Sequence, residues 1–269
     1  MTDRSAQFTG SIPAAYDRFL GPMLFEPYAD DLTARLTVPP TADILEVACG
    51  TGILTERLRR ALPATATLTA TDLNEPMLAY ARAKVPDAGI TWQPADAQVL
   101  PFPDAAFDAV ACQFGLMFVP DKARAFGEVR RALRAHGQFA FNVWLSLAEN
   151  PLGRIARDTI ARYFTSDPPA FYEVPFGFHD EQYIRDLLQA AHFGVVSCER
   201  VVLEARSPSA YDAARGLVTG NPILLDIGER ATAPPEEIIH AVAATLAAEG
   251  GGAPLCLPMR ALVFLARAV

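Results

Sequence analysis

An acidic residue and two glycines stand close together in the segment 44–52, Ile-Leu-Glu-Val-Ala-Cys-Gly-Thr-Gly. Glu46 lies within a short apolar run typical of a buried strand, and Gly50 and Gly52 follow in a tight turn. Glycine permits positive φ angles and a close ligand approach that a Cβ would block. The helix-like residues from Ile53 onward would point their free N–H groups back at a bound molecule. The segment therefore predicts a binding loop for a nucleotide-like ligand.

Polar residues also end the next three strand-like runs of the chain. These residues are Asp72, Asp96 and Gln113. Carboxyl ends of parallel strands meet at one edge of a sheet, where such sheets bind ligands. The Asp72 carboxylate offers two acceptor oxygens and no donor, which suits the two hydroxyls of a ribose. We therefore expect a nucleoside beside Asp72.

Apolar residues next to these acids would suit a flat base. Leu73 and Met77 follow Asp72 and could supply an apolar surface, while Asp96, followed by Ala97, could accept a hydrogen bond from the exocyclic amine of adenine. Together with Gln113 at the end of the fourth run, these residues predict an adenosine site.

The glycine turn fits two common phosphate-binding patterns poorly. A dinucleotide loop needs a third glycine three residues after Gly52, where Thr55 stands. A Walker loop needs a lysine, and Ile53 follows Gly52 instead. The acid at Glu46 favours a ligand that carries a positive charge, such as an ammonium or a sulfonium.

Strand-like and helix-like segments alternate from Ile44 to Trp144, a pattern typical of a doubly wound α/β sheet. The predicted strands are 43–48, 66–72, 90–95, 107–113 and 138–144. The predicted helices are 52–62, 75–85 and 121–134, the last with His136 and Gly137 as its C-terminal signal. These strands would place the polar residues along one edge.

The flanking segments differ from this core. Residues 10–36 predict N-terminal helices that pack on the sheet, and 145–180 is rich in proline and aromatic residues. That second segment has two interpretations, hydrophobic packing under a long connection or a lid that faces substrate. A helix at 181–191, a strand at 194–204, a helical insertion over 208–249 and a strand at 259–267 complete the prediction.

Length and charge exclude several classes of protein. With 269 residues the chain can form one domain, and its net charge of −8 lacks the basic surface of a nucleic-acid binder. We find no signal peptide and no membrane-spanning segment, and so expect a cytoplasmic protein. The cysteines lack the paired spacing of a metal site, so no metal is expected.

The motifs resemble those of class I S-adenosylmethionine-dependent methyltransferases, specifically the branch that includes quinone-biosynthesis and other small-molecule enzymes. Residues 46–52 resemble motif I of that family, 70–78 resemble motif II, and 95–110 resemble motif III and the next strand. Within motif I, Ala48 stands where many relatives have glycine, and we expect little loss from it. The resemblance covers about residues 40–145.

The resemblance implies a Rossmann-like seven-stranded sheet whose last strand is antiparallel, with helical cap insertions. It implies one methyltransferase domain over 1–269, with N-terminal helices at 1–36, a cofactor-binding core at 37–145 and substrate-cap insertions at 146–180 and 207–257. The cofactor would be S-adenosyl-L-methionine. Its binding residues would be Glu46, Gly50, Gly52, Asp72, Leu73, Met77, Asp96, Ala97, Gln113 and Phe114.

The acceptor would be a small apolar or aromatic molecule. No Asn-Pro-Pro-aromatic motif of nitrogen methyltransferases follows Gln113, so methylation of oxygen or carbon is favoured. If a proton must be removed, His179 and Tyr16 are the candidate catalytic residues. An NAD-dependent oxidoreductase and a non-catalytic S-adenosylmethionine-binding relative stay open as alternatives, and neither the acceptor nor the oligomeric state follows from the sequence.

Overall fold

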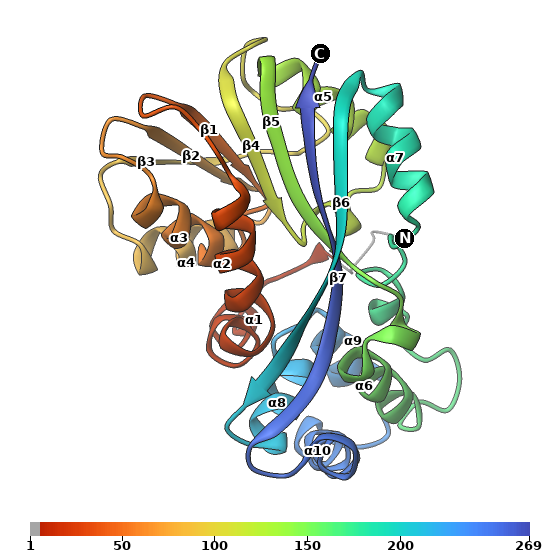
Figure 1. Ribbon diagram of the computed structural model, residues 1–269. Helices are drawn as coiled ribbons and strands as arrows, with labels where there is room; N and C mark the ends of the chain where they lie inside the picture. Colours follow the sequence, from red (N-terminus) through yellow and green to blue (C-terminus); the bar gives the residue numbers. More distant parts are fainter. Residues whose placement is uncertain (1–5) are drawn as a thin grey trace.

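Seven strands form one sheet in the computed structural model, which describes residues 6–269 (Figure 1). Their order is β3-β2-β1-β4-β5-β7-β6. β1 to β5 are parallel, and β7 runs antiparallel to both β5 and β6. The strands are β1 (Asp43–Val47), β2 (Thr67–Asp72), β3 (Ile90–Pro94), β4 (Phe107–Gln113), β5 (Leu133–Trp144), β6 (Phe193–Ser207) and β7 (Leu255–Ala268). The predicted Rossmann-like sheet with an antiparallel last strand is confirmed.

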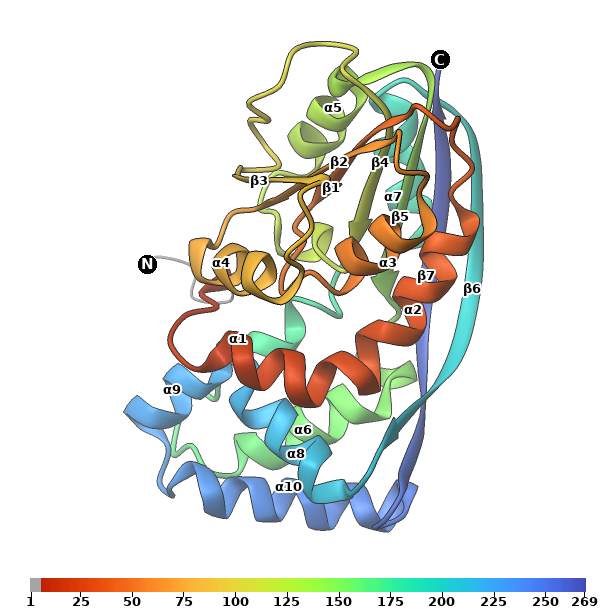
Figure 2. The same cartoon turned by 90° about the vertical axis from the view of Figure 1, so that its left-hand side faces the viewer.

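Helices cover both faces of this sheet, with α2 and α5 on opposite sides (Figure 2). The helices that belong to the sheet layers are α1 (Ile12–Ala15), η2 (Tyr16–Phe25), α2 (Glu26–Arg35), α3 (Ile53–Ala61), α4 (Glu75–Lys84), η3 (Leu116–Phe118), α5 (Lys122–Ala132) and α7 (Glu181–Ala190). Residues 1–5 of the expected N-terminal segment lie outside the described part of the chain.

A second group of helices lies beyond the carboxyl ends of the parallel strands, at the far end of the long antiparallel pair of strands β6 and β7 (Figure 1). We call it the lower helical layer. It comprises α6 (Pro151–Ala161), α8 (Ala210–Thr219), α9 (Ile223–Arg230) and α10 (Pro235–Gly250), with the short turns η4 (Leu147–Glu149) and η5 (Phe171–Glu173) beside it. The carboxyl ends of β1 to β5 therefore face the lower helical layer.

The N-terminal segment forms a π-helix, η2, where the sequence predicted only helix of unspecified type. Pro22 lies inside η2 and has no N–H to donate, so a regular α-helical ladder cannot run through this segment. The wider turns of η2 place Tyr16 at one end and Phe25 at the other. Both aromatic rings face the carboxyl end of the sheet, where they stack with their ring centroids 4.6 Å apart.

The predicted end of the helix before β5 is wrong. α5 ends at Ala132, because Leu133 already pairs with Phe107 of β4 and β5 begins there. His136, expected in a helical C-terminus, has a φ of 65° inside β5, where the register of β4 and β5 shifts. Arg134 belongs to the strand and pairs with Asp43 of β1 at 2.8 Å, while Arg130 and Arg131 lie in the last turn of α5.

Candidate ligand-binding site

Three adjoining cavities lie at the carboxyl ends of the parallel strands, and Tyr16 lines all three. The cleft cavity, about 770 Å³, extends over the ends of β2 and β4. The turn cavity, about 290 Å³, lies at the glycine turn after β1. The aromatic cavity, about 670 Å³, lies between the sheet and the lower helical layer. A ligand with three different parts could extend through them around Tyr16.

Asp72 is held in the wall of the cleft cavity by the backbone of two turns. Its Oδ2 accepts from the Gly50 N–H at 2.8 Å, and its Oδ1 accepts from the Asn74 N–H at 2.7 Å. The side chain is buried, and burial raises the pKa of its carboxyl while these N–H donors offset part of the rise. Asp72 therefore joins the glycine turn to the end of β2 and has a fixed orientation toward the cleft.

Glu46 is a buried acid in the wall of the turn cavity. It is 1% exposed, and its Oε2 has no hydrogen-bond partner among the described residues. Burial raises the pKa of this carboxyl to about 8, with the nearby Thr55 hydroxyl lowering it and the Asp72 charge raising it further. A cation in the turn cavity would favour the ionised form of this carboxyl and pair with it, which agrees with the positive ligand expected from the sequence.

The two glycines of the turn have different surroundings. Gly50 has a φ of 55° and lines both the cleft and the turn cavity. Gly52 has a φ of 79°, and a Cβ on it would lie 3.1 Å from the Cβ of Ala81 in α4. Gly52 lines none of the three cavities, since its missing side chain makes room for α4. Only Gly50 gives a ligand close access.

The remaining predicted cofactor residues gather around the cleft cavity. Leu73, Met77, Asp96, Ala97, Gln113 and Phe114 all line it. The Leu73 side chain is 63% exposed, although it is apolar. An apolar side chain left open beside a polar cleft is suited to cover a flat ring. The carboxylate of Asp96 accepts from the backbone and side chain of Gln98, at 2.8 and 3.1 Å, which fixes its direction.

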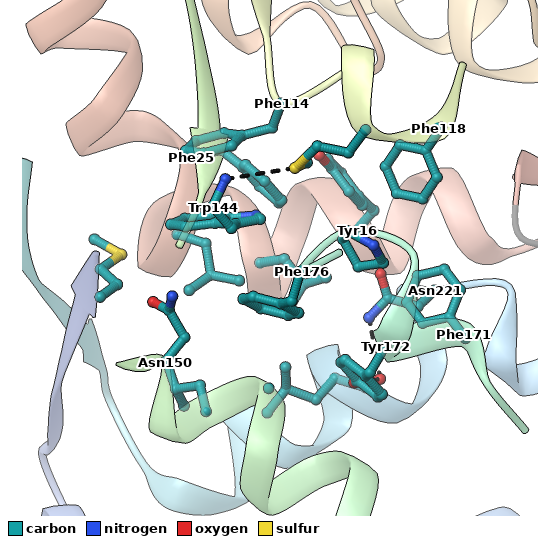
Figure 3. Close-up of a pocket in the computed structure, with 18 of the residues that line it drawn as sticks. Tyr16, Phe25, Phe114, Phe118, Trp144, Asn150, Phe171, Tyr172, Phe176 and Asn221 are labelled. Carbon is teal, nitrogen blue, oxygen red and sulfur yellow. Dashed lines mark hydrogen bonds between the residues drawn. The ribbon is translucent and has the colours of Figure 1, made fainter. Parts of the chain in front are cut away.

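Aromatic side chains dominate the third cavity (Figure 3). Phe25, Phe114, Trp144, Phe171 and Phe176 contribute rings to its wall, and no Asp, Glu, Lys, Arg or His is among the described residues that line it. Its polar residues are largely occupied by other bonds. For example, the Nδ2 of Asn150 donates to the carbonyls of Leu145, Ser146 and Arg260, and its Oδ1 accepts from the Arg260 N–H. The cavity suits an uncharged, flat molecule.

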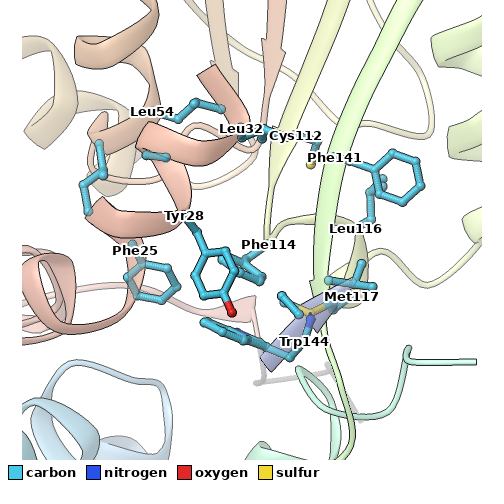
Figure 4. Packing of buried hydrophobic residues seen from close by; sticks show 14 of the residues in the cluster. Phe25, Tyr28, Leu32, Leu54, Cys112, Phe114, Leu116, Met117, Phe141 and Trp144 are labelled. Carbon is cyan, nitrogen blue, oxygen red and sulfur yellow. The ribbon is translucent and has the colours of Figure 1, made fainter. Parts of the chain in front are cut away.

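Gln113 and Phe114 connect the cavities to the core. The Nε2 of Gln113 donates to the carbonyl of Phe25 at 2.6 Å, and Gln113 also lines the cleft and turn cavities. Gln113 therefore satisfies a backbone carbonyl of a distant segment and also faces the space where a ligand would lie. The ring of Phe114 stacks on that of Trp144, with centroids 3.8 Å apart, and packs against Tyr28, as Figure 4 shows. The floor of the aromatic cavity is continuous with the hydrophobic core.

The two candidate catalytic residues lie in different places. Tyr16 stands where the cavities meet, and burial, with the charges of Asp72 and Asp17, raises the pKa of its phenol well above the usual value. His179 is exposed, lines none of the three cavities, and its Nδ1 is 2.8 Å from the carbonyl of Phe176. We do not retain His179 as a catalytic candidate, because its ring caps a backbone turn outside the site.

Several lining residues were not singled out from the sequence. Phe118 lines both the cleft and aromatic cavities, and Trp144, Asn150, Leu217 and Asn221 line the aromatic one. Trp144 ends a predicted strand, so its position was a usable signal. Leu217 and Asn221 come from the lower helical layer, and no local pattern indicates which face of a helix meets a distant strand end.

The chain is similar to known methyltransferases. Residues 45–141 match the methyltransferase domain family. A curated relative, the ubiquinone/menaquinone biosynthesis C-methyltransferase UbiE of Saccharophagus degradans, is 39% identical over 99 residues, which are 35% of this chain and 40% of that protein. The chain thus spans well under half the length of this relative.

Solved structures share the fold at low sequence identity. The YcgJ protein of Bacillus subtilis has a TM-score of 0.59 and 16% identity, over 90% of this chain and 98% of that one. Phosphoethanolamine N-methyltransferase 2 of Haemonchus contortus, in complex with S-adenosyl-L-methionine, has a TM-score of 0.61 and 14% identity, over 97% of this chain and 57% of that one. Across the described residues, every helix is too short or too polar to span a membrane.

Proposed function

We propose that this protein, in which residues 45–141 form a methyltransferase domain, transfers a methyl group from S-adenosylmethionine to a small, uncharged apolar or aromatic acceptor. The observation that carries this proposal is the arrangement of the three cavities around Tyr16. Two of them have the polar groups that an amino-acid nucleoside needs, and the third is almost wholly apolar. When bound, the cofactor supplies a methyl group on a positively charged sulfur, which becomes neutral once the methyl leaves.

The residues of the cleft and turn cavities fit this cofactor. Asp72, oriented by two backbone N–H groups, would accept from the ribose hydroxyls, and Leu73 and Met77 would cover the adenine ring, with Asp96 and Ala97 at its edge. The buried Oε2 of Glu46, which has no partner among the described atoms, would balance the ammonium of the methionine part. Gly50 would allow the backbone to approach, and Gln113 and Phe114 would lie toward the aromatic cavity.

The aromatic cavity would hold the acceptor in line with the methyl group and keep water out. Alignment in a dry pocket can supply much of the acceleration in a displacement that starts from a charged leaving group. We assign the acceptor-facing cap to residues 146–180 and 207–257, since Phe171, Phe176 and Leu217 contribute to the cavity wall.

Tyr16 would act as a hydrogen-bond donor and not as a base, because its raised pKa keeps the phenol protonated at neutral pH. Among the described residues that line the aromatic cavity we find no group that is free to accept a proton near pH 7. A proton that a neutral acceptor releases on methylation of its oxygen or carbon would therefore have to reach solvent, since no side chain of this cavity would take it.

Two other functions predict different ligand preferences. An NAD-dependent oxidoreductase would use the same sheet edge and Asp72, but it would bind NAD in preference to adenosyl ligands. A non-catalytic relative would bind S-adenosylmethionine and never transfer its methyl group. The missing third glycine after Gly52 and the uncompensated Glu46 support the adenosyl ligand over NAD.

Thermal shift with S-adenosylmethionine, S-adenosylhomocysteine and NAD, followed by mass spectrometry with neutral aromatic acceptors, tests the proposal. A ligand at about one hundred times its dissociation constant should add roughly 2.7 kcal/mol to the free energy of unfolding. We expect a shift with both adenosyl compounds and a mass gain of one methyl group on an aromatic acceptor. A shift with NAD alone would support the oxidoreductase, and adenosyl binding without transfer to any acceptor would support the non-catalytic relative.

A further inference from the structure

Strand β6 forms one free edge of the seven-stranded sheet. In Figure 2 much of it runs along the right-hand outline of the molecule, while Figure 1 shows α7 beside the upper part of the strand, before residues 199–206. Residues 199–206 of this strand, Glu-Arg-Val-Val-Leu-Glu-Ala-Arg, contain no proline or glycine that would interrupt pairing with another strand. An edge of this kind is a template for a further strand.

The backbone of Val202 faces this open edge. Val202 is paired with Arg260 of β7. The N–H of Arg260 donates to Asn150 Oδ1 at 2.8 Å, and its C=O accepts from the Leu145 N–H at 3.0 Å. Both backbone groups of Arg260 therefore point away from β6. In an antiparallel ladder, such a pair is not hydrogen-bonded across the strands, so the N–H and C=O of Val202 point outward too. The backbone C=O and N–H groups of Arg200 and Glu204, two positions before and after Val202, point outward for the same reason.

The side chains on this part of β6 are complementary to their own copy. Arg200, Val202 and Glu204 project from one face of the strand and are exposed, Val202 by 54%. If β6 pairs antiparallel with β6 of a second copy, with Val202 opposite Val202, Arg200 of each copy lies opposite Glu204 of the other. A two-fold axis then creates two ion pairs around an apolar centre.

The charges also select this register over a neighbouring one. A shift of the second strand that places Val202 opposite Glu204 would bring Arg200 opposite Arg206, a like-charge pair. Within one copy, Arg200 pairs with Glu149, and Glu204 lies 3.8 Å from Arg206. The five N–H donors of a guanidinium allow Arg200 to contact a second carboxylate as well.

We propose that two copies of this chain associate through β6, in antiparallel register centred on Val202, so that their sheets become one continuous sheet. Charged residues on a sheet edge commonly keep strands apart. Here the opposite charges attract in a single register. The association does not depend on the proposed methyl transfer, and residues 199–206 line none of the three cavities.

The molar mass of the intact protein by light scattering and sedimentation, over a range of concentrations, tests this association. We expect a dimer for the wild type. Arg200→Glu and Glu204→Arg, which each place two like-charge pairs at the interface, should weaken it about tenfold or more. The double variant Arg200→Glu/Glu204→Arg should restore it, because it re-creates both ion pairs in the opposite sense. Glu149→Gln, which removes only the internal partner of Arg200, should leave the dimer intact.

A second measurement uses the apolar centre. Val202→Cys should form a disulfide between two copies under mild oxidation, since paired residues in a hydrogen-bonded position have Cα atoms about 5.5 Å apart, within the range that a disulfide spans. The wild type, with Cys198 and Cys256, is the matched control. A wild type that stays monomeric at all concentrations, a dimer unaffected by both single charge reversals, or a Val202→Cys protein that does not cross-link would overturn the proposal.

Discussion

Ala48 and Gly115 fit together at the end of the first strand only because Gly115 has no side chain. A Cβ on Gly115 would lie 2.4 Å from the Cβ of Ala48 and 3.0 Å from the Sγ of Cys112. Ala48 itself has a φ of 56°, in the left-handed region that favours glycine. The alanine at position 48 is thus accommodated by a glycine on the neighbouring strand end, at the cost of a strained backbone.

Ala48→Gly should therefore stabilise the protein. The variant removes the left-handed strain, worth about 1–2 kcal/mol, although the greater freedom of glycine in the unfolded chain offsets part of this gain. We expect a net increase of about 0.5–1 kcal/mol in the free energy of unfolding, measured by urea denaturation. Ala109→Gly, in β4 where a regular strand conformation needs no glycine, should be destabilising under the same conditions. A loss of stability in Ala48→Gly would show that the strain is not real.

Gly115→Ala should be destabilising, and Ala48→Gly should relieve it. The added methyl group overlaps the Ala48 Cβ at 2.4 Å, and overpacking of this kind costs roughly 1–3 kcal/mol. The backbone conformation adds no strain to this variant, because Gly115 has a φ of −99° that alanine adopts freely. Urea denaturation of both single variants and the double variant should give a positive coupling of about 1 kcal/mol or more. Purely additive effects would indicate that the methyl group meets only Cys112.

The sequence predicted the part of the fold that depends on local pattern. Apolar runs such as 44–47 and 107–112 are buried on both faces, so their composition alone identifies parallel strands. The acids at the ends of such strands converge because parallel strands end at one edge. This is why Glu46, Asp72 and Asp96 could be assigned to one site from the positions of the strands along the chain.

The rest depended on contacts between distant segments. The long β6–β7 ladder, with pairs from Phe193–Ala268 to Ser207–Leu255, extends beyond both predicted strands because each strand lengthens the other. Gly52 was expected to face a ligand, but its neighbour is Ala81, which lies in a helix that the glycine motif does not specify. His179 lies in an aromatic segment, and only the path of that segment places its ring outside the cavities.

The free energy of unfolding of the ligand-free protein should decrease as the pH rises from about 5 to about 8, because of Glu46. Its pKa rises from an ordinary 4.5 to about 8 on folding, so the folded state binds more protons than the unfolded state within this window. The free energy of unfolding then decreases as the pH rises, by about 3–5 kcal/mol across the whole window if Glu46 titrates alone. Asp72, whose pKa burial also raises, contributes with the same sign.

Glu46→Gln isolates this contribution. The amide is nearly the same size and does not titrate, so the variant should show a flatter dependence of the unfolding free energy on pH between pH 5 and pH 8. Urea denaturation at half-unit steps gives both curves, and their difference should follow a single titration. Parallel curves for the wild type and Glu46→Gln would mean that Glu46 is charged, and compensated, in the folded protein.

Asp72→Asn should abolish most adenosyl binding while leaving the protein folded. An amide can accept through one atom only, so its NH₂ group would face either the Gly50 or the Asn74 N–H, and one of the two bonds that orient the turn would be lost. The ribose would also lose a charged acceptor. Together these changes should weaken binding by roughly 2–3 kcal/mol, or about a hundredfold, in titration calorimetry with S-adenosylhomocysteine.

Asp87→Asn is the matched control for Asp72→Asn. Asp87 likewise accepts from a backbone N–H, that of Gly89 at 2.7 Å, but it does so in an exposed turn away from the three cavities. Its replacement should leave the affinity for S-adenosylhomocysteine unchanged, and circular dichroism should show both variants folded. Equal affinities of Asp72→Asn and the wild type would place the nucleoside away from the end of β2, because no ligand that bonds Asp72 through its hydroxyls could tolerate this exchange.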